Sequence, residues 1–74
     1  MSIAVTRDFY ALRIHFGDVL HVSLNWRDLI GVHAWSDSDH EYSIEYVLRG
    51  GNLVTEYTDV EKWTTILAGL DEIL

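Results

Sequence analysis

Residues 10–26 carry the clearest pattern in the chain and read YALRIHFGDVLHVSLNW. Apolar and polar side chains alternate on both sides of a central Gly-Asp pair, which is typical of two half-buried β-strands joined by a turn. The apolar side chains share one face, the predicted inner face of a sheet, and they are Tyr10, Leu12, Ile14, Phe16, Leu20, Val22, Leu24 and Trp26. The stretch therefore predicts a β-hairpin.

Three further segments continue the alternation toward the C-terminus. It is clear in residues 42–49 and 52–57, and the Gly50-Gly51 pair between them supplies the positive φ angles of a two-residue hairpin turn. Residues 29–36 also alternate, whereas the polar run over 36–41 indicates a loop. The sequence thus predicts strands at about 9–16, 20–26, 29–36, 42–49 and 52–57, with a weaker signal for a short strand over 3–5.

A helix is predicted over residues 59–73. Thr58 and Glu61 have the spacing of a capping box, in which each side chain bonds the backbone N–H of the other residue. Apolar residues then recur every three or four positions, as in a helix that packs one face on a sheet: Val60, Trp63, Ile66, Leu67, Leu70, Ile73 and Leu74. A glycine such as Gly69 lowers the stability of a helix by about 1 kcal/mol relative to Ala. We therefore expect it to have a structural role, which is to permit close approach of the helix to a strand.

Together these elements predict an α+β fold in one domain, residues 1–74. The expected architecture is an antiparallel five-stranded meander sheet with one C-terminal amphipathic helix packed on one face. The five inner faces coincide if the first three loops have odd lengths and the Gly-Gly turn has two residues, because a slip of one residue would flip a whole strand. Because one set of loop lengths brings all five apolar faces to the same side, the meander is favoured.

Composition limits the classes of function. Hydrophobic residues make up 49% of the 74-residue chain, and the absence of Cys excludes disulfides and thiolate metal sites. The net charge of −7 opposes binding to nucleic-acid phosphates and to anionic membranes. No membrane span and no signal-peptide pattern is recognisable. We therefore expect a cytoplasmic protein with no cofactor, no direct nucleic-acid binding and no membrane partner.

A row of histidines is the sharpest chemical pattern. In the predicted register His15, His21 and His33 lie side by side on the outer face, followed by Glu45 and Glu56. Imidazoles on neighbouring strands could share a zinc ion or exchange a proton. However, three ligands in a line converge poorly on a tetrahedral metal, and a solvated face or a dimer surface explains the same residues.

The polar loop offers a second pattern. Asp37, Asp39 and Glu41 alternate like the first ligands of a calcium loop, but the turn glycine and the distal Glu of such a loop are missing. An ordinary solvated turn is the favoured interpretation. The loop is also a candidate site for a basic protein partner, because clustered carboxylates steer encounter.

No enzyme is predicted, because the chain has no Cys, no nucleophile-elbow serine and no phosphate loop. A sheet covered by one helix leaves one face bare, and small proteins often bury such a face by self-association or by binding a partner. We therefore expect a protein-interaction module, most simply a homodimer, whose interface residues are Arg13, Trp35, Val47, Arg49 and Val54.

Two alternative functions are also compatible with the sequence. One is an acidic inhibitor that occupies the nucleic-acid channel of a basic enzyme, as small phage-encoded anti-restriction and anti-CRISPR proteins do. Size and charge support it, whereas the spread of the carboxylates over turns and helix ends favours ordinary solvation. The other is a metal-binding protein that uses the histidine row.

Overall fold

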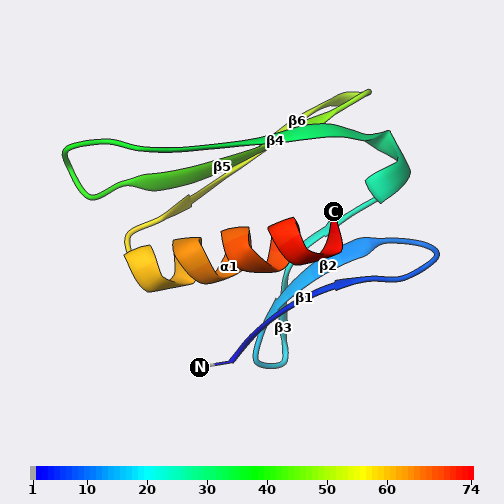
Figure 1. Ribbon diagram of the computed structural model, residues 1–74, viewed down its shortest axis with the longest axis horizontal. Helices are drawn as coiled ribbons and strands as arrows, with labels where there is room; N and C mark the ends of the chain where they lie inside the picture. Colours follow the sequence, from blue (N-terminus) through cyan, green and yellow to red (C-terminus); the bar gives the residue numbers. More distant parts are fainter. Residues whose placement is uncertain (1) are drawn as a thin grey trace. The chain divides into compact units, whose positions relative to one another are not determined.

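A computed structural model describes residues 2–74 as an α+β fold with six strands, one 3₁₀ helix and one C-terminal α-helix (Figure 1). The elements in chain order are β1 (Ile3–Arg7), β2 (Leu12–Phe16), β3 (Val19–Leu24), the 3₁₀ helix (Trp26–Asp28), β4 (Leu29–Ser36), β5 (Tyr42–Leu48), β6 (Gly51–Tyr57) and α1 (Val60–Ile73). Within the described part of the chain, no helix has the length and apolar character needed to cross a membrane.

The strands form two antiparallel sheets, ordered β1-β2-β3 and β4-β5-β6. The chain divides accordingly into two compact units. The first contains the described residues up to Trp26 together with Thr64–Leu74, and the second contains Arg27–Trp63. The first turn of α1 thus belongs to the second unit and the remainder to the first. The prediction of one domain stays a prediction.

The predicted single five-stranded meander is wrong. Strand β1 joins the first hairpin as a third strand, and β3 does not pair with β4. The connection between β3 and β4 is the 3₁₀ helix, whose two ends are bonded within different units. The indole Nε1 of Trp26 donates to the carbonyl of Asp8 at 2.8 Å, and the carbonyl of Asp28 accepts from the backbone N–H of Arg49 at 3.0 Å. These bonds hold the connecting residues within their own units and replace a β3–β4 hairpin turn.

The β2–β3 hairpin confirms the predicted register in part. The expected pairing holds from Leu12 to Ile14 and shifts beyond it, because His21 is an extra residue in β3. The hairpin closes through a two-residue turn in which Gly17 has φ of 58°. The sequence required an odd loop here, and the bulge supplies that odd residue within the strand.

The β5–β6 hairpin turns one residue earlier than predicted, at residues 49–50. Glu45 therefore faces Val54 and not Glu56. This moves the pairing by two positions, and an even shift leaves every side chain on its predicted face. Gly51, with φ of 145°, follows the turn in a backbone conformation that disfavours other residues.

The buried apolar side chains confirm most of the predicted inner faces. They are Ala11, Leu12, Ile14, Val22, Leu24, Ile66 and Leu70 in the first unit and Ile44, Tyr46 and Tyr57 in the second. Four strand residues predicted to face inward, Tyr10, Leu20, Ile30 and Leu53, are exposed instead, and Ala11, predicted to face outward, is buried. Tyr10 precedes β2, whereas Leu20 and Ile30 lie next to or within bulges, so the regular alternation does not apply to them.

Helix α1 begins one residue later than predicted, and its N-cap is Asp59. The Asp59 carboxylate accepts from the backbone N–H of Glu61 at 2.9 Å, and its carbonyl accepts from that of Trp63 at 3.2 Å. The predicted capping box at Thr58 is therefore wrong. A carboxylate at the cap is favoured by the positive end of the helix dipole. Farther along the first turn, the indole of Trp63 donates to the Ser43 carbonyl of β5 at 2.9 Å.

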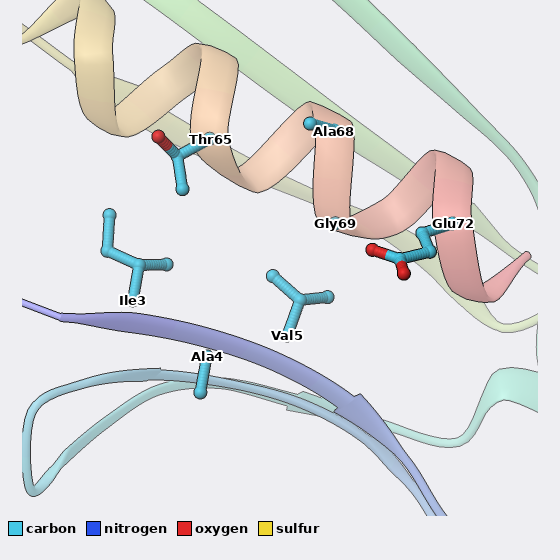
Figure 2. A pocket seen from close by; sticks show the side chains of 7 residues that line it. All are labelled: Ile3, Ala4, Val5, Thr65, Ala68, Gly69 and Glu72. Atoms are coloured by element: carbon cyan, nitrogen blue, oxygen red, sulfur yellow. The ribbon is translucent and has the colours of Figure 1, made fainter.

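The predicted close approach at Gly69 is confirmed. A Cβ atom built on Gly69 would lie 2.7 Å from Cγ2 of Val5, which real Cβ atoms essentially never do. Figure 2 shows the Val5 side chain directed from β1 toward the helix at this point. Glycine is therefore required sterically for α1 to meet β1 at this distance.

Candidate functional site

The strand register of the second unit gathers one group of side chains on a single sheet face. Side chains alternate along each strand, so this face is opposite the one that carries the buried Ile44 and Tyr46. Its three cross-strand rows run through β4, β5 and β6. We call it the Trp35 face, and it consists of Gly31, Val47 and Asn52, then His33, Glu45 and Val54, then Trp35, Ser43 and Glu56.

Glu45 occupies the centre of the Trp35 face and has polar neighbours on both sides. Its Oε2 accepts from the side-chain amide of Asn52 at 2.9 Å, and its Oε1 lies 3.8 Å from Nδ1 of His33. The predicted pairing of His33 with Glu45 across β4 and β5 is confirmed. At 3.8 Å their contact is too long for a hydrogen bond, so Asn52 is the stronger partner of this half-buried carboxylate.

Trp35 is the largest apolar group of the face. Its ring lies 5.0 Å from the imidazole of His33, tilted by 39°, and 39% of the residue remains exposed. Val54 is 47% exposed and Val47 is half-buried. The face therefore combines an aromatic side chain with two branched aliphatic ones around an internally bonded carboxylate.

The predicted interface residues separate into different parts of the structure. Trp35, Val47 and Val54 lie on the Trp35 face, whereas Arg49 lies in the turn that follows β5. Arg13 lies in β2 of the other sheet, where its Nη1 is 2.5 Å from Oδ2 of Asp8. Three of the five residues thus share one surface.

The predicted histidine row does not form across one sheet. His21 is the bulged residue of β3 and its ring stacks on Phe16 with centroids 4.3 Å apart. Because of this bulge, His15 pairs with Leu20 and not with His21. His33 belongs to the other sheet. Among residues 2–74, no three side chains of His, Cys, Asp or Glu form a group that could hold a metal ion.

The acidic loop between β4 and β5 is ordered by one of its own carboxylates. Oδ1 of Asp37 accepts from the backbone N–H groups of Asp39 at 2.9 Å and of Glu41 at 3.2 Å. The N–H of Asp37 donates to the Glu41 carbonyl at 3.0 Å, and His40 has φ of 61°. Asp37 thus closes the turn, and Asp39 and Glu41 are exposed beside it.

Sequence reasoning missed a second surface, the turn between β1 and β2. Phe9 and Tyr10 are 70% and 74% exposed there, with ring centroids 5.2 Å apart in an edge-to-face arrangement. We call residues 8–11 the aromatic turn. The available signal was Asp8 directly before the two aromatic residues, since Asp often accepts from backbone N–H groups two or three residues ahead.

Asp8 holds the aromatic turn in one conformation. Its Oδ1 accepts from the N–H groups of Tyr10 at 2.8 Å and Ala11 at 2.9 Å, while its own N–H donates to the Ala11 carbonyl at 3.0 Å. The bond from Ala11, the side chain of Arg13 and the bond from Tyr10 lower the pKa of Asp8 from 3.8 to about 2. The ionised carboxylate is therefore the form that organises the turn at neutral pH.

Comparison of the chain with known protein families, with curated proteins and with solved structures gives no match.

Proposed function

We propose that this protein is a non-enzymatic protein-interaction module that self-associates through the Trp35 face. The observation that carries the proposal is the exposure of Trp35 and Val54 on one face of the β4-β5-β6 sheet. Trp is among the residues that contribute most to protein interfaces when its partner excludes water from it. A second copy would cover the aromatic ring and both valines with the same surface.

The central charge of the face supports self-association over the binding of a cationic partner there. Burying a carboxylate is costly unless it is hydrogen-bonded or paired. Glu45 already receives a hydrogen bond from Asn52 and lies beside His33. Its burial would therefore require no cation from the partner molecule.

The experiment compares two charged substitutions on the same strand. Trp35→Glu places a carboxylate on the proposed interface, while Ile30→Glu places one at the β4 bulge, where Ile30 is 67% exposed and outside the Trp35 face. We expect Trp35→Glu to weaken self-association at least about tenfold in sedimentation equilibrium, and Ile30→Glu to leave it unchanged.

Val54→Glu provides an independent variant on β6 of the same face. Far-UV circular dichroism establishes that each variant keeps its secondary structure. Unchanged self-association of both Trp35→Glu and Val54→Glu would contradict the proposal, as would an equal loss in Ile30→Glu.

A second candidate function is supported by the distribution of charge. The second unit contains eight Asp or Glu residues against three Lys or Arg residues, so most of the net charge of −7 resides there. An acidic inhibitor of a basic nucleic-acid-binding enzyme would use such a surface. The exposed carboxylates of Asp39 and Glu41, on a loop held by Asp37, would be its contact residues.

Binding to an oligolysine peptide tests this candidate. Neutralising the loop by Asp39→Asn and Glu41→Gln should weaken binding more than the equal charge change Asp71→Asn and Glu72→Gln on α1. Equal losses in the two variants would indicate a simple effect of net charge and would contradict a recognition role for the loop.

A further inference from the structure

The aromatic turn has the properties of a preorganised binding element. Phe9 and Tyr10 project from a four-residue turn that the Asp8 carboxylate and one backbone bond hold in place. Because few degrees of freedom remain to be frozen on binding, such a turn loses little conformational entropy when its side chains are buried. Their exposed fractions, 70% and 74%, exceed those of all other large apolar side chains in residues 2–74.

Two arginines flank this turn, and one of them, Arg13, is paired with the Asp8 carboxylate of the turn itself. The Arg7 guanidinium lies 4.8 Å from the ring centre of Trp26, and that indole donates to the carbonyl of Asp8. Arg13 contacts the Asp8 carboxylate from β2. These are the two Lys or Arg residues of the first unit, although the chain as a whole carries a charge of −7. A complementary surface would therefore be apolar with a carboxylate at its edge.

The same unit contains a groove of this kind between β1 and α1 (Figure 2). It is an open groove with a volume of about 420 Å³. The strand side presents Ile3 and Val5, and the helix side presents small residues and one carboxylate, Glu72. The small helix residues are Thr65, Ala68 and Gly69.

We propose that the aromatic turn of one copy binds the β1–α1 groove of a second copy. Phe9 and Tyr10 fill the apolar part of the groove, and Arg7 approaches Glu72 at its rim. In a symmetric pair each copy contributes one turn and one groove, so both contacts form at once. This contact uses only the first unit and is separate from the Trp35 face of the second unit.

Sedimentation equilibrium in a Trp35→Glu background isolates this contact from the Trp35 face. We expect the background to retain residual self-association, and the double substitution Phe9→Ser and Tyr10→Ser to reduce its association constant at least about tenfold. The matched control is Val19→Ser, which removes another exposed apolar side chain at the opposite hairpin of the same sheet. This control should change nothing.

A charge exchange tests the groove separately. Glu72→Lys adds a cation to the last turn of α1, where the helix dipole favours it, so folding should be preserved. Glu72→Lys and Arg7→Glu should each weaken association, and an equimolar mixture of the two variants should associate more strongly than either alone. The proposal is overturned if the aromatic substitutions have no effect, if Val19→Ser has the same effect, or if the mixture shows no recovery.

Discussion

The two units of the protein are both three-stranded antiparallel meanders, yet they present their exposed aromatic residues in different ways. In the second unit Trp35 belongs to a sheet face and its ring contacts that of His33. In the first unit Phe9 and Tyr10 project from a turn that Asp8 organises. Strand register creates the first surface, whereas one side chain bonded to the backbone creates the second.

This difference explains why each surface should respond to different substitutions. The Trp35 face persists as long as β4, β5 and β6 keep their register, which their buried side chains maintain. The aromatic turn depends in addition on the ionised Asp8 carboxylate and its hydrogen bonds. Substitutions in the two cores, at the helix contact and at Asp8 can therefore separate the two units experimentally.

The largest expected effects come from shortening one core residue in each unit. Ile14 and Ile44 are fully buried in the central strands β2 and β5. Ile14→Ala and Ile44→Ala should each lower the free energy of unfolding by about 2–5 kcal/mol, because each loses apolar burial and leaves a cavity. Urea denaturation followed by circular dichroism measures the change. A loss below about 1 kcal/mol for either variant would contradict its position in a packed core.

The next largest effect is expected at the contact of α1 with β1. Gly69→Ala should improve intrinsic helix propensity by about 1 kcal/mol but force its Cβ against Val5, at a cost of about 1–3 kcal/mol. We therefore expect a small net loss of thermal stability. A Cβ on residue 69 would also lie 2.8 Å from Cβ of Val5, so Gly69→Ala should be less destabilising in a Val5→Gly background than in the unmodified protein. A clear stabilisation by Gly69→Ala alone would contradict the close approach.

Tyr46 provides a smaller effect in the second unit. It is fully buried and burial raises the pKa of its hydroxyl, a rise that the nearby Thr55 side chain partly opposes. Within residues 2–74 the hydroxyl makes no hydrogen bond of good geometry. Removing an unpaired buried hydroxyl relieves a desolvation cost, so Tyr46→Phe should leave stability unchanged or raise it by about 1 kcal/mol. Thermal denaturation measures this change. A loss greater than about 1 kcal/mol would indicate that the hydroxyl is bonded in solution.

The smallest effect is a pH dependence confined to the first unit. The pKa of Asp8 is lowered from 3.8 to about 2 in the folded protein, so its stabilising contribution is complete above about pH 4 and is lost between about pH 4 and pH 2. Asp8→Asn should remove this part of the acid sensitivity. Thermal midpoints of both proteins across that interval measure it, and parallel curves would contradict the role of the carboxylate.

Local alternation was sufficient to predict most strands and their inner faces. It placed Ile14 and Tyr46 inside correctly, and the composition of the helix predicted the close approach at Gly69. It also predicted that Trp35, Val47 and Val54 lie on one face. These properties depend on the spacing at which apolar residues recur along the chain, and this spacing can be read directly from the sequence.

Sheet partners could not be predicted in the same way. The separation of β3 from β4 accompanies bonds such as that from Trp26 to the carbonyl of Asp8, eighteen residues earlier in the chain. No periodic pattern encodes a bond between a side chain and a distant backbone group. The aromatic turn was missed for a related reason. Alternation extended the predicted strand back past Tyr10, whereas hydrogen bonds to Asp8 hold residues 8–11 in a turn and β2 begins at Leu12.

Self-association through the Trp35 face can be measured by sedimentation equilibrium of the unmodified chain alongside Trp35→Glu. We expect the mass of the unmodified protein to rise above 8.5 kDa with concentration, and Trp35→Glu to shift this rise to at least about tenfold higher concentration. A mass of 8.5 kDa for the unmodified protein at every concentration would contradict self-association through either surface. Concentration-dependent dimerisation that Trp35→Glu leaves unchanged would contradict the assignment to the Trp35 face.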